Sequence, residues 1–132
     1  MPDVNRRAAL IVAGLTGFLG IALGAFGAHA LKHILNVNHM ILVWNTAVLY
    51  HLVHAPVLMM LAQTKTGNST VNAPPFLCFC VGILFFSGSL YVLALTNIPW
   101  LGAITPVGGL LLMAGWLLIA LGAFKGVFTE EL

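Results

Sequence analysis

The chain alternates between long apolar runs and short polar segments. A helix that crosses the hydrocarbon core of a bilayer needs about 20 mostly apolar residues. Runs that meet this length cover approximately residues 8–31, 41–62, 74–95 and 100–124. The first run is longer than the apolar core of a signal peptide, so we expect it to remain as a span. The pattern predicts an all-α membrane protein, with residues 1–132 forming a single domain that is a bundle of four transmembrane helices.

Charged residues between the spans indicate how the chain is oriented. The basic residues that fall on one side of the membrane are Arg6, Arg7, Lys65 and Lys125, whereas Lys32 alone falls on the other. The cytoplasmic side of a membrane protein is enriched in Lys and Arg. We therefore expect both termini to be cytoplasmic. The Thr105-Pro106 pair, followed by Gly108-Gly109, predicts a bend or a delayed start in the fourth helix.

Composition narrows the possible functions. Of the 132 residues, 61% are hydrophobic and 6% are charged, against about 25% charged in a typical soluble domain. The few basic residues are scattered, which excludes the clustered positive surface that nucleic-acid binding requires. The only acids are Asp3, Glu130 and Glu131 at the chain ends. No carboxylate is therefore available inside the membrane to couple transport to protons or cations.

Glycines recur on one face of the first and fourth spans. Small residues in such rows allow two helix backbones to approach closely, which is a common basis of helix association in lipid. The first row falls within an arc of about 80° at 100° per residue, and the second recurs every seven residues. The predicted packing seam consists of Gly17, Gly20, Gly24, Gly27, Gly108, Gly115 and Gly122.

The second span carries most of the polar side chains. Four of them fall on one arc of the helix, which we expect to face the interior of the bundle. Hydroxyl groups of the third span complete the candidate polar cluster, which consists of Thr46, Tyr50, His51, His54, Ser87 and Ser89. Pro56 frees a backbone carbonyl one turn earlier and favours a kink.

These residues support no specific chemistry. A bis-histidine haem needs ligands at similar depths, but His29 lies near the end of the first span and His51 lies about 15 Å into the second. We expect no cofactor, no metal and no catalytic residues, because no serine lies near an acid and no hydrolase or phosphate-binding motif is present. A proton relay through His51 and His54 remains an alternative.

Several short motifs occur in an order that resembles one bacterial family. They are Gly24-Ala-Phe-Gly-Ala-His-Ala-Leu31, Thr46-Ala-Val-x-Tyr50 with His54-Ala55, Ser87-Gly-Ser-Leu-Tyr91, and Thr105-Pro-Val-Gly-Gly109 with Gly115-Trp116. Together they cover nearly the whole chain and resemble the inner-membrane family called domain of unknown function 423 (DUF423), whose eukaryotic relatives are called transmembrane protein 256. The resemblance implies four spans and a plasma-membrane location, and it implies no established activity. Pro56 departs from the aliphatic residue expected there.

The sequence therefore favours a non-enzymatic membrane protein surrounded by lipid. We expect it to act as a homo-oligomer or as an accessory subunit of a larger membrane complex, because small-residue seams are abundant and catalytic groups are not. The alternative is a binding or permeation module for a small apolar or lipid-like ligand, using Tyr50, His54 and the hydroxyl groups of the third span.

Overall fold

Four long helices make up most of the protein. The computed structural model describes residues 5–64 and 73–125. The long helices are α1 (Arg6–Ala28), α3 (Ile41–Gln63), α4 (Ala73–Thr96) and α5 (Thr105–Phe124). A short helix, α2 (Lys32–Val37), joins α1 to α3, and a 3-10 helix, η1 (Pro99–Ala103), precedes α5. Four helical segments are long and apolar enough to cross a membrane, so the prediction of a four-helix transmembrane protein is confirmed.

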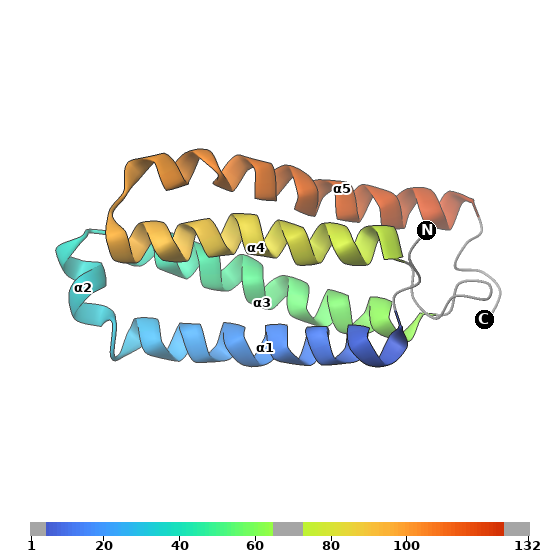
Figure 1. Ribbon diagram of the computed structural model, residues 1–132, viewed down its shortest axis with the longest axis horizontal. Coiled ribbons are helices and arrows are strands. Elements are labelled where there is room, and N and C mark those ends of the chain that lie inside the picture. The colour runs from blue at the N-terminus through green and yellow to red at the C-terminus, as the bar shows by residue number, and fades with distance from the viewer. Residues whose placement is uncertain (1–4, 65–72, 126–132) are drawn as a thin grey trace.

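The long helices form an open row. Helix α1 lies against α3, α3 against α4, and α4 against α5 (Figure 1). Among the described residues, no Cα atom of α1 comes within 8 Å of one in α4 or α5. Each outer helix, α1 or α5, therefore packs its backbone against a single long neighbour, and much of its apolar surface faces outward.

Side-chain and backbone caps define the helix ends. The Asn5 side chain accepts a 2.9 Å hydrogen bond from the backbone N–H of Arg7 and so begins α1. At the opposite end of the bundle along the helix axes, the Asn38 side-chain amide donates to the carbonyls of Ala94 and Leu95, at 2.9 and 3.1 Å. These carbonyls lie in the last turn of α4, where no helical donor is available. Asn38 therefore ties the connection after α2 to the end of α4.

The fourth span begins later than its apolar run. Residues 99–103 form η1, and α5 starts only at Thr105, with Pro106 in its first turn. Proline is favoured there because it lacks the N–H that the first turn cannot use. The delayed start predicted from Thr105-Pro106 is therefore observed, and the fourth span consists of two helical pieces.

The four seam glycines of α1 all face α3, whereas Gly14 faces open space. A Cβ atom added to Gly17 would lie 3.8 Å from Ala55, one on Gly20 would lie 2.6 Å from Leu52, and one on Gly24 would lie 3.3 Å from Val48. At Gly27 an added Cβ would overlap the indole ring of Trp44. The partner positions decrease as the glycine numbers increase, as antiparallel packing requires. The first seam is thus filled by α3 of the same chain.

The glycines between α4 and α5 serve the same purpose. An added Cβ on Gly108 would overlap the backbone of Phe86, and one on Gly115 would lie 2.8 Å from the Phe79 ring. From the α4 side, one on Gly82 would lie 2.7 Å from Leu112. Gly122 is partly exposed. The α1 seam and the Gly108 and Gly115 positions of the second seam are therefore filled inside the chain, which removes them as surfaces for a second copy.

Substitution of Gly108 tests this packing. We expect Gly108→Ala to destabilise the protein by about 1–3 kcal/mol, because the new methyl group meets backbone atoms that cannot move aside alone. Gly14→Ala is the matched control, since a Cβ there meets nothing within 4 Å and alanine favours the helix by up to about 1 kcal/mol. Thermal unfolding in detergent, followed by circular dichroism, distinguishes the two. Equal losses in both variants would contradict the assignment.

Candidate functional site

Two histidines of α3 lie inside the row because α3 is covered on one side by α1 and on another by α4. The exposed fraction is 7% for His51 and 4% for His54. They stand one helical turn apart, so their rings lie at neighbouring depths on the covered side of α3. Together with the hydroxyl groups of α4 they form the polar interior of the protein.

His54 links α3 to α5. Its Nδ1 lies 2.7 Å from the carbonyl oxygen of Tyr50, and its Nε2 lies 3.2 Å from the indole nitrogen of Trp116. A carbonyl can only accept and an indole N–H can only donate. The neutral ring therefore carries its proton on Nδ1 and accepts at Nε2. A second proton on Nε2 would face the indole N–H, and the bond to Trp116 would be lost.

His51 links three helices. Its Nδ1 lies 3.2 Å from the hydroxyl oxygen of Tyr91 on α4, and its ring lies beside the backbone of Thr16 on α1. The Tyr91 ring in turn packs on Trp44, with ring centroids 4.7 Å apart. The Trp44 indole donates to the carbonyl of Leu23 on α1 at 3.0 Å. An aromatic and hydrogen-bonded chain thus connects α1, α3 and α4.

The serines of α4 are also engaged. Ser87, fully buried, donates to the carbonyl oxygen of Ala47 on α3 at 2.8 Å. Ser89 lies 3.0 Å from the Phe86 carbonyl, which can only accept, and 2.8 Å from the Thr105 hydroxyl on α5. When Ser89 donates to Phe86, Thr105 donates to Ser89. One serine therefore bridges α4 to α3 and the other bridges α4 to α5.

The prediction that all four polar residues of α3 face the interior is wrong for Thr46 and Tyr50. Thr46 is exposed, and its hydroxyl donates back to the Leu42 carbonyl of its own helix. Tyr50 is 41% exposed. On a helical projection both residues lie on the same side of His54, opposite to His51, and this side of α3 is the less covered one. The Tyr50 ring rests on Phe86, with centroids 4.4 Å apart, and within the described residues its hydroxyl has no hydrogen-bond partner.

Trp116 and Trp44 are the residues that the candidate cluster missed. An indole N–H inside a span needs an acceptor, and that requirement was the available signal. It applies to Trp44, which is buried, and to Trp116, which is 48% exposed but whose N–H bonds to His54. The acceptors come from other helices, however, so their identity depends on the order of the row.

The histidines outside the interior do not form a metal site in this structure. His29 is exposed at the end of α1. In the part of the chain that the structure describes, no group of three or more His, Cys, Asp or Glu side chains could hold a metal ion. Cys78 and Cys80 are free and partly buried.

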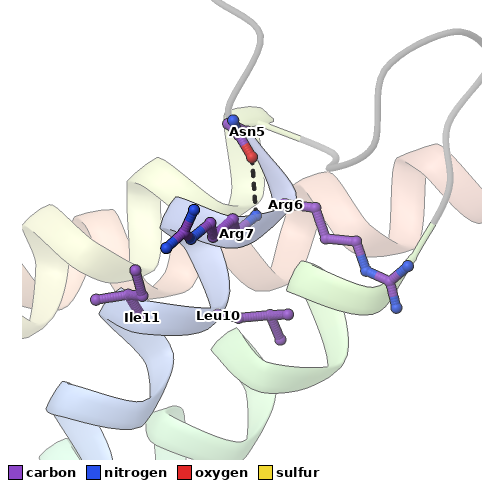
Figure 2. A pocket seen from close by; sticks show the side chains of 5 residues that line it. All are labelled: Asn5, Arg6, Arg7, Leu10 and Ile11. Atoms are coloured by element: carbon purple, nitrogen blue, oxygen red, sulfur yellow. Dashed lines mark hydrogen bonds between the residues drawn. The ribbon is translucent and has the colours of Figure 1, made fainter.

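Hollows lie on two surfaces of the described protein. One is an open depression at the start of α1, lined by Asn5, Arg6, Arg7, Leu10 and Ile11 (Figure 2). Two others follow one face of α3. The first, of about 180 Å³, is lined by Leu49, Tyr50, Val53 and His54. The second, of about 220 Å³, lies between α3 and α5 and is lined by Val57, Met60, Leu61, Thr64, Trp116 and Ile119.

The chain is similar to bacterial membrane proteins over most of its length. Residues 23–109 match the family described as "Protein of unknown function (DUF423)". A UPF0382 membrane protein of Staphylococcus haemolyticus is 44% identical over 89% of this chain and 96% of its own length. The UPF0382 membrane protein YwdK of Bacillus subtilis is 40% identical, with 88% and 95% covered, and that of Haemophilus influenzae is 36% identical, with 88% and 93% covered. No solved structure matches. These relatives and the four apolar helices show a multi-pass bacterial membrane protein.

Replacement of Trp116 tests the bond between α3 and α5. We expect Trp116→Phe to destabilise the protein by about 0.6–1.7 kcal/mol, because one interhelical hydrogen bond in a membrane is lost. The control is Trp100→Phe, since Trp100 is 64% exposed. Unfolding in detergent gives the stability, and nitrogen-15 NMR of labelled histidine reports whether His54 carries its proton on Nδ1. An Nε2-protonated His54, or an equal loss in the control, would contradict the assignment.

Proposed function

This chain belongs to the DUF423 family, and from that premise we propose that it is a non-enzymatic assembly component of the membrane, acting as a homo-oligomer or as an accessory subunit of a larger complex. One observation supports the proposal most directly. The four buried polar side chains of the described residues, namely His51, His54, Ser87 and Ser89, all hydrogen-bond within the chain. These groups hold helices together and are not free to act on a substrate.

We place the partner contacts on the outer faces of α1 and α5, although α3 and α4 also expose large apolar side chains such as Met60 and Leu84. The backbone of each outer helix comes close to that of one long neighbour only. Large apolar side chains cover both outward faces, with Phe18 and Ile21 on α1 and Leu110 and Met113 on α5, all about two-thirds exposed. Van der Waals packing of such side chains is one of the forces that associate helices in lipid. We therefore place the assembly contacts on the outer faces of the two outer helices, α1 and α5, and not on the glycine seams.

The distribution of charge supports an orientation for this component. Along the helix axes, one end of the bundle is where α1 begins and α5 ends, and it carries Arg6, Arg7 and Lys125 (Figure 1). Lys32 lies at the opposite end of the bundle. The expected fourth basic residue of the first group, Lys65, lies outside the described residues. The excess of positive charge favours the cytoplasm for the first end, so both termini are proposed to be cytoplasmic.

The alternative of a binding or permeation module loses most of its proposed residues. His54 and both serines already have partners, which argues against a ligand held by them or a proton passed through them. Tyr50 keeps a free hydroxyl among the described residues, but it lies on the outer surface of the row.

Native mass spectrometry of the protein extracted in mild detergent tests the assembly role. We expect dimers or larger homo-oligomers, or a stoichiometric complex with another membrane protein. Met113→Trp on the outer face of α5 should reduce that assembly by disturbing the contact. Leu84→Trp on α4 is the matched control, because Leu84 is also 67% exposed but lies on an inner helix of the row. A monomer with no co-purifying protein would refute the proposal, and equal effects of both substitutions would refute the placement on α5.

A further inference from the structure

The larger hollow on α3 is an apolar groove between α3 and α5. Val57, Met60, Leu61 and Thr64 form one wall, and Trp116 and Ile119 form the other. The one hydroxyl in this lining, that of Thr64, donates to the Leu61 carbonyl at 2.8 Å. The Trp116 N–H is bonded to His54. The groove therefore presents hydrocarbon and aromatic surface only.

The groove covers a large part of one leaflet of a bilayer in depth. Its outer end is at Thr64, the residue that caps α3. Its inner end is at Trp116, which is fixed to His54. The α3 residues of the lining run from Val57 to Thr64, which is seven residues or roughly 10 Å along a helix. One leaflet of a hydrocarbon core about 30 Å thick is about 15 Å deep, so the groove runs from the headgroup level about two-thirds of the way through one leaflet.

Positive charge lies at the outer end. Lys125 caps α5 and follows Ile119 by six residues, which is roughly 9 Å along the helix axis. The Arg6 side chain extends from the start of α1 towards the end of α3 (Figure 2). The acids of the chain, Asp3, Glu130 and Glu131, all lie outside the described residues. The charged residues that the structure describes at this end are Arg6, Arg7 and Lys125, whose positive charge complements an anionic headgroup.

The size of the groove favours a chain thinner than a helix. One turn of a helix, 5.4 Å of a cylinder about 10 Å wide, occupies about 400 Å³. The groove offers about 220 Å³ along two turns of α3. An extended acyl chain fits a groove of this size, whereas a helix of a second copy could only pack over its mouth, an outcome that the Ile119→Phe variant distinguishes.

We propose that the groove between α3 and α5 binds one acyl chain of an anionic phospholipid, with Lys125 facing its phosphate. The lipid belongs to the leaflet that surrounds the axial end of the bundle where α1 begins. Trp116 closes the inner end of the groove, so the same indole that bonds to His54 also limits the depth of the chain. This site is separate from the outer faces proposed for assembly.

A lipid titration followed by native mass spectrometry tests the site in the full-length protein. The probes are phosphatidylglycerol and phosphatidylcholine with identical acyl chains. We expect one phosphatidylglycerol to bind the wild type about fivefold more tightly than phosphatidylcholine, the effect of one basic residue near a phosphate. Lys125→Gln should remove this preference, whereas Lys32→Gln at the opposite end should leave it unchanged. Equal binding of the two lipids to the wild type, or equal losses in the two variants, would overturn the headgroup assignment.

A second pair of variants tests the groove itself. Ile119→Phe fills the groove and should weaken the binding of both lipids at least fivefold. Leu117→Phe, at a residue of α5 that is 60% exposed, should weaken the binding of neither lipid. If Ile119→Phe changes the oligomer population and leaves lipid binding intact, the groove is a protein interface and the proposal is wrong. If both variants bind lipid like the wild type, the lipid lies elsewhere and the proposal is also wrong.

Discussion

Two helices in a bilayer gain little from hiding apolar side chains against each other, because lipid tails are as apolar as leucine. Their association depends instead on close packing and on hydrogen bonds that lipid cannot supply. Here the close packing comes from glycines in α1 and α5 that admit side chains, and in one case backbone, from the next helix. These contacts pair α1 with α3 and α4 with α5, and hydrogen bonds such as that from Ser87 to the Ala47 carbonyl join α3 to α4. Helices α3 and α4 therefore lie in the middle of the row, and their polar side chains become the buried ones.

The hydrogen bonds of the interior follow from that order. Each buried polar side chain bridges to a neighbouring helix or to its own backbone, and His54 reaches past α4 to the Trp116 indole of α5. Because an unpaired polar group in hydrocarbon is costly, these bridges favour one arrangement of the four helices over others with similar apolar contact. The same bridges give each buried polar side chain of the described residues at least one partner within the chain. Interaction with other molecules is then expected at the outer faces and grooves.

Much of this fold could be predicted from the sequence, because span length and residue periodicity are local properties. The four apolar runs gave the four helices, and the spacing of the α1 glycines gave the face that packs. Periodicity does not identify the helix that a face meets. The α1 seam was therefore considered for contact with a second copy, although it is filled by Trp44, Val48, Leu52 and Ala55 of the same chain. Thr46 and Tyr50 were misplaced for the same reason, since an arc on a helical projection does not show where its neighbours stop covering it. The roles of Trp116 and Asn38 depend on contacts across more than 50 residues, which no local pattern contains.

Disulfide formation in native membranes tests the helix order most directly. An added Cβ on Gly17 lies 3.8 Å from the Ala55 Cβ, which is close to the mean separation in disulfides. In a background with Cys78→Ala and Cys80→Ala, the pair Gly17→Cys and Ala55→Cys should form an intramolecular disulfide on mild oxidation. The pair Gly17→Cys and Ala114→Cys, which would join α1 to α5 near mid-span, should form none within one chain. An efficient intramolecular disulfide in the second pair, or its absence in the first, would contradict the open row and the packing described for it.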